Sequence, residues 1–159
     1  MNEPKKIVLL GATGSIGDSV LRVIRKHPDC LELFGISAHS NLAKLIEIAK
    51  EFKVPHAHLV KEPENISSFP ETTRFSFGNK ALLELASMEE SDICVVAIVG
   101  AAGLQPTLSA IESGQDIVLA NKESLVMGGE LVMKTAKERD VRIIPADSEH
   151  NAVLQCLDG

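Results

Sequence analysis

The sequence predicts an α/β fold, with a doubly wound, mainly parallel β-sheet and helices on both of its faces. Short apolar runs alternate with segments whose apolar residues recur every three or four positions, as in strands alternating with helices. Residues 93–99 are continuously apolar, which is typical of a strand covered on both faces. Gly-, Asn- and Asp-containing motifs follow several of these runs, at the edge where such sheets bind ligands.

Composition limits the class of protein. The 159 residues are 45% hydrophobic, which suits one compact domain with a sizeable core. The net charge of −6 argues against broad attraction to nucleic acid or to an anionic membrane. The three isolated cysteines are typical of reduced, mostly packing residues. No apolar run is long enough to span a membrane and no signal segment is seen, so we expect a cytoplasmic protein.

The expected elements follow one another in strand–helix order. The strands are residues 7–10, 31–37, 57–60, 93–99, 117–119 and 141–144. The helices are one that carries Val20, Leu21, Val23 and Ile24, and segments 42–52, 82–88, 106–113, 131–139 and 152–157. Gly114 is the expected stop of the fourth helix. Residues 62–80, rich in Pro, Ser, Thr and Glu, are interpreted as a surface connection.

Residues 11–17, Gly-Ala-Thr-Gly-Ser-Ile-Gly, join the first strand to the first helix. Glycines at Gly11, Gly14 and Gly17 allow a tight turn, close approach of the backbone to a phosphate, and close packing of the helix on the strand. The start of the helix offers free N–H groups to that phosphate. Asp18 follows Gly17, so the motif is not a P-loop of the GK[ST] type. The context predicts a Rossmann-like dinucleotide site.

The end of the second strand favours NADP over NAD. An NAD site usually has a carboxylate there, about twenty residues past the glycines, and this chain has Ser37, Ala38 and His39. His39, Ser40 and Asn41 can donate hydrogen bonds to a ribose phosphate. The alternative is that Ser40 and Asn41 only cap the second helix. Both roles are compatible.

Two further motifs follow later strands at the same edge. Asp147 and Glu149 lie two positions apart in extended chain, so their carboxylates can converge on magnesium or manganese. The alternative is a solvated turn. Lys122, after another strand, can bind or polarise a substrate oxygen, and the alternative there is an ordinary surface lysine.

Four motifs together resemble the 1-deoxy-D-xylulose 5-phosphate reductoisomerase family. They are Gly11-Ala-Thr-Gly-Ser-Ile-Gly17, Ala97-Ile-Val-Gly-Ala-Ala-Gly103, Leu119-Ala-Asn-Lys-Glu-Ser-Leu125 and Asp147-Ser-Glu-His-Asn151. The resemblance covers the amino-terminal, NADPH-binding part of that family. It implies rearrangement of deoxyxylulose phosphate, followed by reduction with NADPH to 2-C-methyl-D-erythritol 4-phosphate, an isoprenoid precursor of the non-mevalonate route.

The resemblance also implies roles for individual residues. Those implied to bind the cofactor are Thr13, Gly14, Ser15, Ile16, His39, Ser40, Asn41, Asn121 and Glu123. Those implied to bind substrate are Lys122, Ser148 and Glu149, with Lys122 and Glu149 also catalytic. Asp147 and Glu149 match the ligands of Mn²⁺ or Mg²⁺. The family often carries Gly-Lys-Asn where this chain has His39, Ser40 and Asn41, so two of three positions differ.

We expect residues 1–150 to form the NADPH-binding domain and residues 151–159 to begin the connection into a catalytic domain outside this chain. By resemblance, a third metal ligand, the substrate-phosphate site and a lid lie beyond Gly159. The 159 residues alone are therefore expected to bind NADPH without turnover, and the complete protein to be a homodimer. A short-chain dehydrogenase is excluded because the chain has no tyrosine. A non-catalytic NADP-binding module is the remaining alternative.

Overall fold

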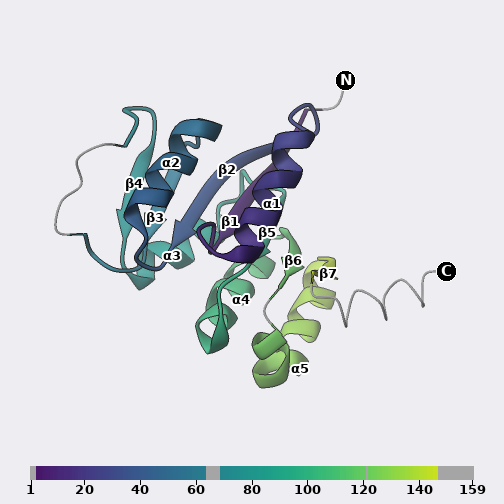
Figure 1. The fold of residues 1–159 in the computed structure, drawn as a ribbon. Helices are drawn as coiled ribbons and strands as arrows, with labels where there is room; N and C mark the ends of the chain where they lie inside the picture. The colour runs from purple at the N-terminus through teal and green to yellow at the C-terminus, as the bar shows by residue number, and fades with distance from the viewer. Residues whose placement is uncertain (1–2, 64–68, 121, 147–159) are drawn as a thin grey trace.

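The computed structural model describes residues 3–63, 69–120 and 122–146. Its sheet has seven strands in the order β4-β3-β2-β1-β5-β6-β7, and all pairs are parallel (Figure 1). The strands are β1 Lys5–Leu10, β2 Leu31–Ala38, β3 His56–Leu59, β4 Arg74–Phe77, β5 Ile93–Val96, β6 Asp116–Leu119 and β7 Ile143–Pro145. The doubly wound α/β fold is therefore confirmed.

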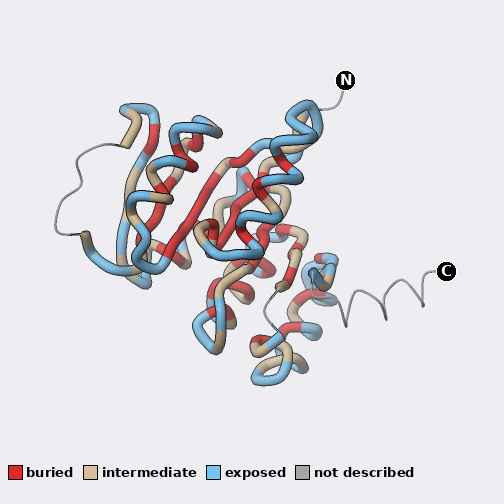
Figure 2. The backbone as a smooth tube through the Cα atoms, viewed as in Figure 1, coloured by how far each residue is buried: buried red, intermediate tan, exposed pale blue. Residues whose placement is uncertain are grey.

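Helices cover both faces of the sheet. They are α1 Ser15–Lys26, α2 Leu42–Phe52, α3 Asn79–Ala86, α4 Leu104–Glu112 and α5 Lys122–Arg139, with a 3₁₀ turn, η1, at Gly100–Gly103. Side chains alternate along β1: Ile7 and Leu9 join the core formed with α1 and α2, and Val8 and Leu10 join the core formed with α3, α4 and α5. Burial is concentrated along the central strands (Figure 2). In the described part of the chain, no helix is long and apolar enough to cross a membrane.

Three expectations about the elements were wrong. Residues 62–80 contain the edge strand β4, which pairs with β3 although its four residues have little apolar pattern. The strand expected at 93–99 ends at Val96, because the chain leaves the sheet and turns at Gly100, where φ is +75°. The last described helix begins at Lys122 rather than at residue 131. Its kink at Gly128 (φ −137°, ψ 21°) interrupts the helical repeat that sequence patterns detect. The expected helix 152–157 lies outside the described residues.

Strand register brings the sequence motifs to one edge. Leu10 pairs with Ser37 on one side and with Val96 on the other. Val96 pairs with Leu119, which in turn pairs with Pro145. Five strands, β1, β2, β5, β6 and β7, therefore end at nearly the same level of the sheet, so the segments after them emerge at one edge. This edge is the carboxyl edge of the sheet, where doubly wound proteins bind ligands.

Candidate functional site

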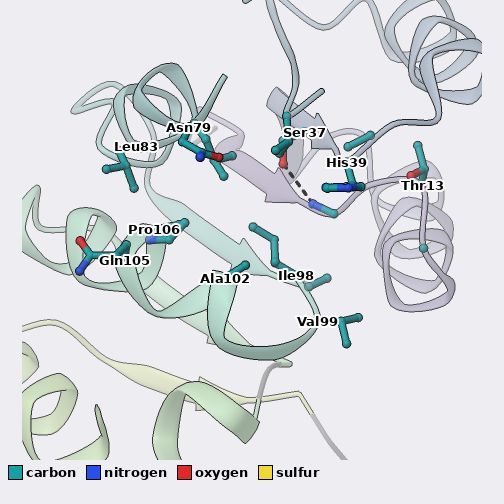
Figure 3. A pocket seen from close by; sticks show the side chains of 16 residues that line it. Thr13, Ser37, His39, Asn79, Leu83, Ile98, Val99, Ala102, Gln105 and Pro106 are labelled. Carbon is teal, nitrogen blue, oxygen red and sulfur yellow. Dashed lines mark hydrogen bonds between the residues drawn. The ribbon is translucent and has the colours of Figure 1, made fainter. Parts of the chain in front are cut away.

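Packing requires two of the three motif glycines, Gly11 in the turn after β1 and Gly17 in the first turn of α1. Gly11 has φ +88°, and a Cβ built there would lie 2.5 Å from the carbonyl oxygen of Ala97. A Cβ on Gly17 would lie 2.5 Å from the carbonyl oxygen of Ala12. The backbone N–H of Gly11 also donates to the Ser37 hydroxyl at 3.2 Å (Figure 3). The turn is thus pressed against β2 and β5, and α1 is pressed against the turn.

Gly14 differs from those two glycines. It is the N-cap of α1, with φ −87° and ψ 175°, a conformation open to any residue. The nearest atom to a Cβ built there is the carbonyl oxygen of Gly11 at 3.6 Å, an ordinary contact. The protein therefore does not require glycine at this position. No side chain caps α1, so the N–H groups of its first turn are free to bind a phosphate, and Gly14 leaves room for it.

A cavity of about 830 Å³ opens beside the glycine turn. Thr13 and Gly14 line it at the turn, Ser37 to His39 at the end of β2, and Val60 after β3. Most of the remaining lining comes from α3, from the chain between β5 and α4, and from the first turn of α4 (Figure 3). The lining is mostly apolar, and it includes Val99, which is 86% exposed to solvent. Such an exposed apolar surface in a concave site is typical of a site for an organic ligand.

The segment after β2 both lines the cavity and caps the next helix, α2. His39 lines the cavity, and Ser40 is exposed beside it. The side chain of Asn41 accepts a hydrogen bond from the backbone N–H of Lys44 at 3.2 Å, so it caps α2. The capping alternative thus holds for Asn41. Near the end of β2, Ser37 is buried and its hydroxyl accepts the hydrogen bond from the backbone N–H of Gly11.

Lys44 was missed by the sequence analysis. Its ammonium donates to the backbone carbonyl of Thr13 at 3.1 Å and forms an ion pair with Asp18 at 2.8 Å. These two contacts of Lys44 tie α2 to the glycine turn and to the first turn of α1. The only available signal was its position one turn after Asn41. Asn79 and Gln105, which also line the cavity, carried no signal because only the folded sheet brings their helices to the glycine turn.

The second group of predicted residues begins α5. Lys122 is exposed, and Glu123 lies in the first turn of the helix, where a carboxylate is favoured by the helix dipole. Neither residue lines the cavity beside the glycine turn. Of the other predicted site residues, Ser15 and Ile16 are exposed at the start of α1. The residues Asn121, Asp147, Ser148 and Glu149 lie outside the described part of the chain.

The metal site predicted from sequence is therefore not described. Within residues 3–63, 69–120 and 122–146, no group of three or more His, Cys, Asp or Glu side chains could hold a metal ion. The backbone N–H of Ala146 donates to the carbonyl of Leu119 at 2.9 Å, so the chain just after β7 lies beside the end of β6. The segment after β6, which begins with Ala120, therefore starts next to the segment after β7.

Two of the ion pairs among the described residues lie at the opposite, amino edge of the sheet. Lys5 and the backbone N–H of Lys6 both bind Asp92 at 2.8 Å and lower the pKa of its carboxyl group. Arg142 binds Asp116 and likewise lowers the pKa of that carboxyl group. These pairs tie together the amino ends of strands β1, β5 and β6 and the segment leading into β7. They stabilise the sheet away from the glycine turn.

The sheet order, the glycine turn and the cavity are those of Rossmann-like nucleotide-binding proteins. Comparison with known proteins identifies the family within that class. The model of 1-deoxy-D-xylulose 5-phosphate reductoisomerase matches residues 7–129. The chain belongs to this family.

Relatives of known name and structure agree. The 1-deoxy-D-xylulose 5-phosphate reductoisomerase of Idiomarina loihiensis is 43% identical over 158 residues, which cover 96% of this chain and 40% of that protein. A crystal structure of DOX-P reductoisomerase in complex with magnesium has 44% identity and a TM-score of 0.89, covering 96% of this chain and 40% of that one. The Zymomonas mobilis enzyme in complex with NADPH has 37% identity and a TM-score of 0.88, covering 96% and 41%. The chain thus spans about 40% of the length of its relatives.

Proposed function

We propose that this chain is the NADPH-binding part of an enzyme that converts 1-deoxy-D-xylulose 5-phosphate to 2-C-methyl-D-erythritol 4-phosphate in non-mevalonate isoprenoid biosynthesis. The observation that carries the proposal is the glycine turn with its open position at Gly14, in a chain of this family. A relative with 37% identity is described in complex with NADPH. Another, with 45% identity, is described with NADPH, fosmidomycin and magnesium.

The cofactor is held mainly by backbone groups. The backbone N–H groups of Ser15 and Ile16, at the start of α1, bind the pyrophosphate, and Gly14 beside them has no side chain to obstruct it. Thr13 lines the same site, and Lys44 holds its carbonyl in place. His39 and Ser40 donate to the ribose phosphate that distinguishes NADP from NAD. Asn41 supports them by capping α2.

The reactive end of the site lies after β6 and β7. When bound, NADPH supplies the hydride, and Mg²⁺ or Mn²⁺ supplies Lewis acidity toward the substrate's carbonyl and hydroxyl oxygens. Lys122 binds a substrate oxygen and stabilises negative charge that develops there. Asn121 and Glu123 orient the cofactor. The metal ligands are Asp147 and Glu149, and Ser148 and Glu149 hold the substrate.

The proposed division of the chain follows from these roles. Residues 1–150 form the NADPH-binding domain, and residues 151–159 lead into the part that carries a third metal ligand. We expect the 159-residue chain to bind NADPH without turnover, because a substrate-phosphate site is not among its motifs. The cytoplasmic location and the homodimer remain predictions.

A chimera tests the proposal. In the Idiomarina loihiensis relative, the aligned 40% would be replaced by this chain, and oxidation of NADPH would be followed with deoxyxylulose phosphate and Mn²⁺. We expect turnover by the chimera and none by the 159-residue chain. NADPH binding by a folded chimera without turnover would favour a non-catalytic NADP-binding module. Turnover by the 159-residue chain would contradict the division proposed above.

A further inference from the structure

The cavity beside the glycine turn contains a slot between two walls. Asn79 and Leu83 of α3 form one wall, and Ala102 and Pro106, from η1 and α4, face them across the cavity (Figure 3). Ile98 lies between the two walls. With Leu83 on one side and Ala102 and Pro106 on the other, the apolar surfaces bound a space of the shape that a planar ring system fills.

The slot is suited to an uncharged group. None of the described residues that line the cavity is Lys, Arg, Asp or Glu. Phosphates are therefore expected at the other end of the cavity, where Thr13 and Gly14 lie at the start of α1. The slot is left for one of the two bases of a dinucleotide.

Sheet order decides which base it is, given the function proposed above. The nicotinamide must reach the substrate, whose proposed ligands follow β6 and β7. One wall of the slot, from η1 and α4, follows β5, but the other belongs to α3, which follows the far edge strand β4. Ala38, at the end of β2, and Val60, just after β3, line the same cavity, and β2, β3 and β4 all lie on the opposite side of β1 from β6 and β7. A dinucleotide centred on the glycine turn after β1 therefore places its adenine in the slot.

Asn79 is the polar side chain placed to recognise that ring. It is the first residue of α3, it is exposed, and its side chain forms no hydrogen bond with any other described residue. Figure 3 shows its carboxamide on the cavity side of α3, whereas that of Gln105 extends away from the slot. We propose that Asn79 reads the adenine of NADPH. Its Oδ1 accepts from the exocyclic amino group, its Nδ2 donates to an adjacent ring nitrogen, and Leu83, one helical turn later, packs on the ring.

The experiment pairs a change in the protein with a change in the ligand. The probes are 2′,5′-ADP, which is the adenosine half of NADP, and its 1,N6-etheno derivative, in which the amino group is blocked. Each is titrated by calorimetry into the wild-type chain, Asn79→Ala and Lys80→Ala. Lys80 is the matched control, because it lies in the same helical turn and its side chain is 92% exposed. NMNH, the nicotinamide half, is the third probe.

We expect Asn79→Ala to weaken 2′,5′-ADP binding by about 3- to 10-fold, the usual range for one or two neutral hydrogen bonds. It should leave the affinities for the etheno derivative and for NMNH unchanged, and Lys80→Ala should change none of the three. An equal loss for 2′,5′-ADP and its etheno derivative, no loss, or a loss confined to NMNH would overturn the assignment. After any one of those outcomes, the proposed function still stands as long as the wild-type chain binds NADPH. If it does not bind NADPH, both proposals fail.

Discussion

Gly11 and Gly14, three positions apart in one turn, should respond oppositely to the same substitution by alanine. At Gly11 the new Cβ would lie 2.5 Å from the carbonyl oxygen of Ala97, and φ is +88°. At Gly14 the nearest atom would be 3.6 Å away, and φ is −87°. The structure therefore predicts that Gly11→Ala damages the fold, and that Gly14→Ala damages only binding.

The magnitudes follow from these geometries. Overpacking against backbone costs about 1–3 kcal/mol, and a left-handed alanine costs about 1–2 kcal/mol more. Gly11→Ala should therefore lower the free energy of unfolding by about 2–5 kcal/mol. At Gly14, alanine is a poorer N-cap than glycine, but it also restricts the unfolded chain by about 0.4–1 kcal/mol, so the two effects nearly cancel. Its methyl group, however, would displace the phosphate from charge-assisted hydrogen bonds worth about 1.5–3 kcal/mol, or roughly 10- to 100-fold in Kd.

Urea unfolding and NADPH titration of the two variants measure these quantities. A second readout is the stabilisation by ligand, which is about 2.7 kcal/mol at 100 times Kd for the wild-type chain and should shrink for Gly14→Ala at the same concentration. Wild-type NADPH affinity in Gly14→Ala would refute the phosphate assignment. A loss of stability in Gly14→Ala as large as that in Gly11→Ala would refute the packing argument.

Two further predictions concern His58 and Asp147. His58 is fully buried, and burial lowers the pKa of its imidazole to about 4. Its Nδ1 lies 3.0 Å from the Ser76 hydroxyl, and its Nε2 has no hydrogen-bond partner among the described residues. Because the fold favours the neutral ring, stability is fully present above about pH 6.5 and falls as pH drops toward about 4, by up to about 3 kcal/mol. Urea unfolding at both pH values should show a smaller loss in His58→Leu, and an equal loss in the variant would contradict the assignment. In the chimera, Asp147→Asn should raise the Mn²⁺ concentration needed for half-maximal turnover at least about 10-fold while leaving NADPH affinity within about 2-fold; an unchanged Mn²⁺ requirement would remove Asp147 from the metal site.

Local patterns were sufficient for most of the fold. Short apolar runs identified β1, β5 and β6, because strands covered on both faces lose the polar alternation of exposed ones. The edge strand β4 has only four residues, none of them fully buried, so it left no such run. The start of α5 was hidden for another reason. Gly128 lies against the Leu104 side chain of α4, and its non-helical backbone (φ −137°, ψ 21°) interrupts the helical repeat.

The site was only partly predictable, because its walls come from distant segments. The glycine turn and the segment 39–41 carry their own signals, the spacing of glycines and the absent carboxylate. Lys44 and Asn79 become part of the site only when parallel strands bring α2 and α3 to the same edge as the turn. Whether Asn41 caps a helix or binds a phosphate also depended on where its side chain points, which sequence alone leaves open.

The most direct test of the account is a titration of the 159-residue chain with NADPH and, separately, with NADH, followed by the fluorescence of the reduced nicotinamide. The glycine turn predicts saturable binding of NADPH. The missing carboxylate after β2 predicts that NADPH binds at least about 10-fold more tightly than NADH, since charge-assisted hydrogen bonds hold the additional phosphate. Absence of NADPH binding by the folded chain, or tighter binding of NADH, would contradict the account.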